Sequence, residues 1–73
     1  MIKVYSKNNC PNCDRIKRLL EKNNIGFEYI KDDDALSEIA KDLHSKGKLK
    51  ETIAPLVLDE NGEQIKHKDL QLL

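Results

Sequence analysis

The sequence predicts an α/β fold with strands and helices in the order β-α-β-α-β-β-α. Short β-rich runs alternate with segments whose apolar residues recur every three or four positions, as in amphipathic helices. An Asn61-Gly62 pair between the last two β-rich runs is typical of a hairpin turn. Because helical crossovers join parallel strands and hairpins join antiparallel ones, we expect a four-stranded mixed sheet.

The first half of the chain supplies two strands and the helix between them. Residues 2–5 alternate in polarity and are rich in β-formers, which predicts the first strand. A helix begins at Pro11, whose missing N–H suits a first helical turn, and ends near residues 23–24, before Gly26. Residues 27–30 form the second strand.

The acidic run that follows begins a second helix. Any of three adjacent residues can supply its N-cap: Asp32, Asp33 or Asp34. The apolar spacing continues through Leu43 and predicts a helix that ends at Gly47.

The last part of the chain is expected to form a hairpin and a short helix. Its strands are predicted at residues 56–58 and 63–65, around the turn at 59–62. Residues 68–73 then form one or two helical turns, with Leu70 and Leu73 on one face.

Composition favours one small domain, residues 1–73, without a nucleic-acid or membrane partner. Charged residues make up 36% of the chain, the hydrophobic set makes up 38%, and the formal net charge is zero. No apolar stretch approaches the ~18 residues of a membrane span. Met1 leads directly into the first strand, which leaves no room for a signal peptide. We therefore expect a cytoplasmic monomer.

Cys10 and Cys13, the only cysteines, lie where the first strand gives way to the first helix. In a reducing cytosol such a pair indicates redox chemistry or metal binding rather than a structural disulfide. At a helix N-terminus, backbone N–H groups and the helix dipole lower a thiol pKa from about 8.5, and Lys7 adds a positive charge. Cys13 lies one turn later on the apolar face. Cys10 is therefore expected to attack a disulfide and Cys13 to resolve the mixed disulfide.

Two further features are open to alternative interpretations. Up to Asn24, six basic residues accompany only two acidic ones, either as a solvated surface or as a region that holds an anionic thiolate or substrate. Pro55 stands before the third strand, where a trans proline is tolerated. Alternatively, a cis Ala54–Pro55 bond faces the dithiol and frees the Ala54 backbone to pair with a substrate.

The run Lys7-Asn8-Asn9-Cys10-Pro11-Asn12-Cys13, with Ala54-Pro55 before the third strand, resembles the glutaredoxins over essentially the whole chain. The resemblance implies a thioredoxin/glutaredoxin-like fold and a thiol–disulfide oxidoreductase without a tightly bound cofactor. It implies a cis-proline at Pro55 and a nucleophile and a resolving thiol at Cys10 and Cys13. The other site residues that it implies are substrate-binding Ala54 and the flanking residues Tyr5, Lys7, Pro11 and Asn12.

Within this family the sequence carries two conflicting signals. Residues 5–10 and 54–57 resemble NrdH-type redoxins, which reduce ribonucleotide reductase and are recharged by thioredoxin reductase with NADPH. The Pro11-containing dithiol resembles glutathione-dependent glutaredoxins, which act on glutathione mixed disulfides.

The C-terminal region departs from both patterns. The Gly-Gly pair of glutathione-binding members is replaced by Lys66-His67-Lys68-Asp69, and the Ser-Gly-Phe-Arg-Pro signature of NrdH redoxins is absent. We therefore favour thioredoxin reductase over glutathione as electron source, and expect Asp69 to cap the last helix.

Two other function classes compete with this interpretation. A zinc site would need four ligands from Cys10, Cys13, His44 and His67, whose spacing fits no zinc-finger pattern, so no metal is expected. His44 is then an exposed residue of the second helix, and His67 a surface residue of the last connection. A non-catalytic binding module of the same fold would have no use for both cysteines.

Overall fold

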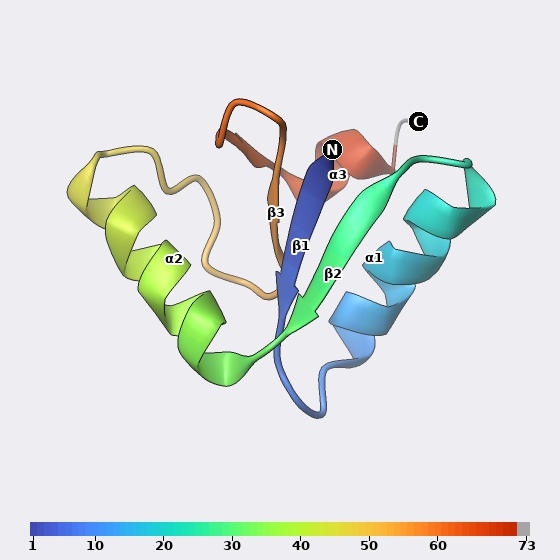
Figure 1. Cartoon of the computed structure of the whole chain (residues 1–73), viewed down its shortest axis with the longest axis horizontal. Coiled ribbons are helices and arrows are strands. Elements are labelled where there is room, and N and C mark those ends of the chain that lie inside the picture. The colour runs from blue at the N-terminus through green and yellow to red at the C-terminus, as the bar shows by residue number, and fades with distance from the viewer. Residues whose placement is uncertain (72–73) are drawn as a thin grey trace.

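A computed structural model describes residues 1–71, whose elements follow the predicted order (Figure 1). The elements are β1 (Ile2–Ser6), α1 (Pro11–Lys22), β2 (Phe27–Lys31), α2 (Asp33–Ser45), β3 (Leu56–Leu58), β4 (Gln64–Ile65) and α3 (His67–Leu70). Within residues 1–71, no helix is long and apolar enough to cross a membrane.

The sheet is four-stranded and mixed, in the order β2-β1-β3-β4. In β1, Val4 lies opposite Tyr29 of the parallel strand β2 and opposite Val57 of the antiparallel strand β3. Val57 in turn lies opposite Ile65 in the β3–β4 hairpin. This pairing confirms the predicted fold class, and it places the carboxyl end of the central strand β1 directly before the two cysteines.

The apolar core is divided between the two faces of the sheet. The cluster on one face joins β1 and β3 to α1 and α3 through Val4, Ile16, Leu20, Val57 and Leu70. The cluster on the other face joins β3 to α2 through Leu43, Leu56 and Leu58. Alternation along the strands produces this division, because successive side chains of a strand point to opposite faces.

Among the three candidate aspartates, Asp32 is the N-cap of α2. Its Oδ1 accepts hydrogen bonds from the backbone N–H groups of Asp34 at 2.9 Å and Ala35 at 3.2 Å. The helix ends at Ser45, slightly before the predicted end, and Gly47 follows with a φ of 69°, a left-handed conformation that glycine adopts readily.

The last helix begins at His67, one residue earlier than predicted, and its expected cap is wrong. Asp69 lies inside α3, and the carboxylate of Glu51, far away in the sequence, accepts the hydrogen bond from the His67 backbone N–H. A short helix after a hairpin can take its cap from another loop, which local sequence does not reveal. The predicted partner of Leu70 on this helix face, Leu73, lies outside the described residues.

Candidate active site

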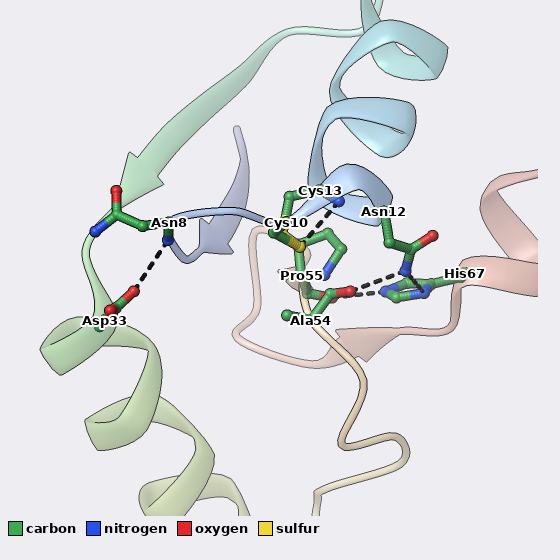
Figure 2. The surroundings of a disulfide bond; sticks show 8 residues. All are labelled: Asn8, Cys10, Asn12, Cys13, Asp33, Ala54, Pro55 and His67. Carbon is green, nitrogen blue, oxygen red and sulfur yellow. Dashed lines mark hydrogen bonds between the residues drawn. A yellow bond between two sulfur atoms is a disulfide. The ribbon is translucent and has the colours of Figure 1, made fainter.

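The two cysteines occupy different environments within one helical turn. Cys10 is the partly exposed N-cap of α1, Pro11 follows at the first helical position, and Cys13 is fully buried. The two form a disulfide, with their Cα atoms 5.2 Å apart. The backbone N–H of Cys13 donates a hydrogen bond to Cys10 Sγ at 3.1 Å (Figure 2). A backbone N–H directed at sulfur and a helix N-terminus are both features that favour a thiolate over a thiol.

The loop before β3 approaches the dithiol from another part of the sequence. Its Ala54–Pro55 peptide bond is cis, which decides between the two interpretations of this proline. A groove of about 460 Å³ brings Cys10 together with Ala54. The residues that line the groove are Lys7, Asn9, Cys10, Pro11, Asn12, Leu36, Thr52, Ile53 and Ala54.

The side chain of Asn12 connects the dithiol helix to this loop. Its Nδ2 donates to the Ala54 carbonyl at 2.8 Å and lies 3.4 Å from Nδ1 of His67 (Figure 2). The Ala54 carbonyl therefore already accepts one hydrogen bond from within the protein.

His67 is not the surface residue that the sequence suggested. It is half-buried at the start of α3, and its Nε2 lies 2.6 Å from the Pro55 carbonyl oxygen. The prediction failed because this contact depends on how the hairpin returns α3 to the cis-proline loop, twelve residues earlier in sequence. The sequence signal at His67 was that larger residues stand where glutathione-binding glutaredoxins carry a Gly-Gly pair.

Buried and charged side chains fix the two loops that form the groove. Gln64 is only 2% exposed, and its Oε1 accepts from the backbone N–H of Lys50 at 2.6 Å and of Glu51 at 3.2 Å. Its Nε2 donates to the Glu51 carbonyl at 2.9 Å. On the other side, the Asn8 N–H donates to Asp33 Oδ1 at 3.1 Å, which links the loop before Cys10 to the start of α2.

The remaining predicted site residues lie in different places. Lys7 lines the groove beside Cys10, whereas Tyr5 packs against the core cluster on the α2 face. Of the basic residues on α1, Arg15 and Arg18 do not line the groove but two other openings, one of which shares Pro11 with the groove.

The histidines lie in separate regions of the molecule. His44 is exposed near the end of α2, whereas His67 adjoins the groove. Within residues 1–71, no group of three or more histidine, cysteine or acidic side chains is arranged to hold a metal ion.

Comparison with known proteins supports the redox interpretation of this geometry. The family model for glutaredoxin matches residues 2–55, which include the dithiol and the cis-proline. The solved structure of glutaredoxin 1 from Francisella tularensis, crystallised with cacodylate, is similar in fold, with a TM-score of 0.71 and 28% sequence identity. The alignment covers 97% of this chain and 87% of that chain. A comparison with curated proteins finds no match.

The matched region contains every element from β1 to the loop that precedes β3, and the structural match extends over nearly all of the chain. The disulfide-forming Cys-x-x-Cys pair at the start of α1 fits thiol–disulfide exchange. The chain therefore belongs to the glutaredoxin family, within the thioredoxin-like superfamily.

Proposed function

We propose that this protein is a dithiol reductant of protein disulfides in the cytoplasm, acting as a monomer with Cys10 as nucleophile and Cys13 as resolving thiol. The difference in exposure between the two cysteines supports this assignment. Cys10 lines the open groove, where a substrate sulfur can approach it, whereas Cys13 is buried and can reach only the sulfur of Cys10.

The reaction transfers two electrons from the dithiol to the substrate. The Cys10 thiolate attacks one substrate sulfur, the substrate S–S bond breaks, and the departing thiolate takes up a proton. Cys13 then gives up its proton and attacks Cys10 Sγ, which releases the second substrate thiol. The Cys10–Cys13 disulfide seen in the structure corresponds to the oxidised product of this cycle.

The proposed substrate-binding residues are Ala54 and Pro55. Ala54 lines the groove together with the neighbouring Ile53, whereas Pro55, which follows Ala54 through the cis bond, is buried. Ile53 is 65% exposed although it is a large apolar residue, and it lies in the groove together with Leu36. Apolar side chains beside a reactive sulfur favour substrates with apolar residues next to the target cysteine. Lys7, on the same groove, supplies a positive charge that favours the thiolate of Cys10.

Among the electron sources that glutaredoxins use, we propose thioredoxin reductase with NADPH, as in NrdH-type redoxins, with ribonucleotide reductase as the substrate. The support is the region where glutathione-binding members carry a Gly-Gly pair. Here it bears Lys66 and the half-buried His67, whose side chain packs onto the Pro55 carbonyl. Glutathione is the alternative reductant, favoured by the match to the glutaredoxin model and by Pro11 in the dithiol.

The test offers the oxidised protein two reducing systems in parallel and follows NADPH consumption. One contains thioredoxin reductase, and the other contains glutathione with glutathione reductase. We expect recharging by thioredoxin reductase alone, with no consumption above background for Cys10→Ser. Recharging by glutathione alone would contradict the NrdH-type assignment and make the protein a glutathione-dependent glutaredoxin. Recharging by neither system would contradict the proposed electron supply altogether.

A further inference from the structure

A chain of side-chain contacts runs from α3 to the cis-proline loop, and the proposed disulfide exchange does not itself require it. His67 Nε2 lies 2.6 Å from the Pro55 oxygen, and His67 Nδ1 lies 3.4 Å from Asn12 Nδ2. Asn12 Nδ2 also donates to the Ala54 oxygen at 2.8 Å. Both carbonyls of the cis-proline pair therefore contact this chain (Figure 2).

The chemistry of these partners determines where the protons lie. A backbone carbonyl only accepts, so His67 Nε2 must carry the proton that it donates to Pro55. The amide nitrogen of Asn12 has two N–H groups, one for the Ala54 oxygen and one that points to His67 Nδ1. Nδ1 can accept that second hydrogen only if the imidazole is neutral. If the Asn12 side-chain oxygen and nitrogen changed places, Oδ1 would face the Ala54 carbonyl oxygen, and two acceptors cannot form a hydrogen bond. The contact with Ala54 therefore fixes the orientation of the Asn12 amide.

We propose that His67 is a positioning residue, which in its neutral form with the proton on Nε2 holds Asn12 and the cis-proline loop in place for a peptide substrate, and which weakens peptide engagement when protonated. This proposal rests on the proposed function. A protonated Nδ1 would point an N–H at the N–H of Asn12, so one hydrogen bond would be replaced by a repulsive donor–donor contact.

Histidine changes charge in the range in which such an effect is measurable, between about pH 5 and pH 8. The charged and titratable groups around the imidazole come from three elements. The Glu51 carboxylate, on the loop before β3, accepts from the His67 backbone N–H, and the dithiol lies on α1. Lys66, Lys68 and Asp69 flank His67 along the chain. The donor–donor conflict depends only on the position of the protons.

The experiment compares two disulfides that release the same thionitrobenzoate chromophore from reduced protein. One is dithiobis(nitrobenzoate), which has no peptide backbone, and the other is a short cysteine peptide joined to thionitrobenzoate. Protonation of Cys10 slows both reactions by the same factor. The ratio of the two second-order rate constants therefore reports only how binding of the peptide part contributes to the rate. In wild type we expect the ratio of peptide to small-molecule rate to fall about threefold to tenfold between about pH 7.5 and about pH 5.5.

Two variants distinguish the effect of His67 protonation on this ratio from other effects of low pH. His67→Gln cannot change charge, so its ratio should be independent of pH, whatever its absolute value. His44→Gln removes the exposed histidine of α2 and should keep the wild-type pH dependence. A wild-type ratio that does not change with pH, or a His67→Gln ratio that falls as in wild type, would overturn the positioning role.

The ring nitrogen chemical shifts of His67, measured by NMR at about pH 7.5, give a readout that does not depend on a variant folding. We expect a neutral ring with the proton on Nε2, and a proton on Nδ1 would overturn the proposal. If wild type reduces neither disulfide, the proposed function is wrong and this proposal is overturned with it. If wild type reduces both disulfides but the ratio stays constant, only the role of His67 is wrong.

Discussion

Cys10 and Cys13 have the same chemical side chain, and their surroundings make them different. Cys13, in the first turn of α1, is 0% exposed, whereas Cys10 is partly exposed and its sulfur accepts a hydrogen bond from the Cys13 N–H. Of the two cysteines, only Cys10 lines the groove. A buried thiol close to the mixed disulfide completes the exchange without entry of a second molecule.

The substitution Cys13→Ser tests these roles directly, because a serine hydroxyl does not displace a thiol from a disulfide. Reduced Cys13→Ser, mixed with a protein disulfide, should accumulate a covalent adduct of the two proteins through Cys10. Intact-mass spectrometry under non-reducing conditions measures it. Cys10→Ser is the matched control and should form no adduct. If Cys13→Ser gives no adduct while Cys10→Ser does, the two roles are reversed.

Between elements, the loop that precedes β3 depends on one buried side chain of β4. Gln64 makes three hydrogen bonds to the backbone of Lys50 and Glu51, which belong to a loop without regular structure of its own. The same loop continues to Ala54 and carries the Glu51 carboxylate that caps α3. Gln64 therefore supports both the groove and the helix that begins with His67.

Replacing Gln64 by leucine should lower the free energy of unfolding by about 1–3 kcal/mol, because partly buried backbone groups of Lys50 and Glu51 lose their hydrogen-bond partners. Urea unfolding followed by circular dichroism measures the change. Gln71→Leu makes the same chemical change at an exposed position and should alter stability by at most about 0.5 kcal/mol. A loss no larger for Gln64→Leu than for Gln71→Leu would show that the loop does not depend on Gln64.

For the molecule as a whole, a short chain must fill two small core clusters, one on each face of the sheet. A chain of about this length buries only ~60% of its unfolded surface, so its total stability is modest and each core side chain is a large fraction of it. Leu20, at 0% exposure, lies in the cluster that joins α1 to β1, β3 and α3. That cluster also sets the position of α1, which carries the dithiol.

Leu20→Ala should therefore lower the free energy of unfolding by about 2–5 kcal/mol through lost apolar contacts and a cavity. Chemical denaturation measures this loss, and the partly buried neighbour Leu19→Ala should cost clearly less. Part of the Leu20→Ala protein should be unfolded at physiological temperature, with disulfide reductase activity reduced in proportion to the unfolded fraction. Equal losses for the two variants would contradict the assignment of Leu20 to the core.

Local patterns account for most of the fold and for the reactive pair. Alternation in residues 2–5, helical spacing after Pro11 and the Asn61-Gly62 turn depend on neighbouring residues, so they predicted the element order and the mixed sheet. The same local logic placed Cys10 at the start of a helix and Cys13 on its buried face, as the structure has them.

Contacts between residues far apart in the chain decided the features of the site that local sequence did not predict. Spacing alone allowed either isomer at Pro55, and only the folded structure and the family resemblance point to the cis bond. Asn12 meets His67 across 55 positions, and Glu51 caps α3 across 16 positions. A hydrogen bond of this kind requires two surfaces that meet only when the sheet and hairpin have formed. The reactive sulfurs could thus be predicted from local sequence, whereas the side chains that fix the groove around them required the tertiary structure.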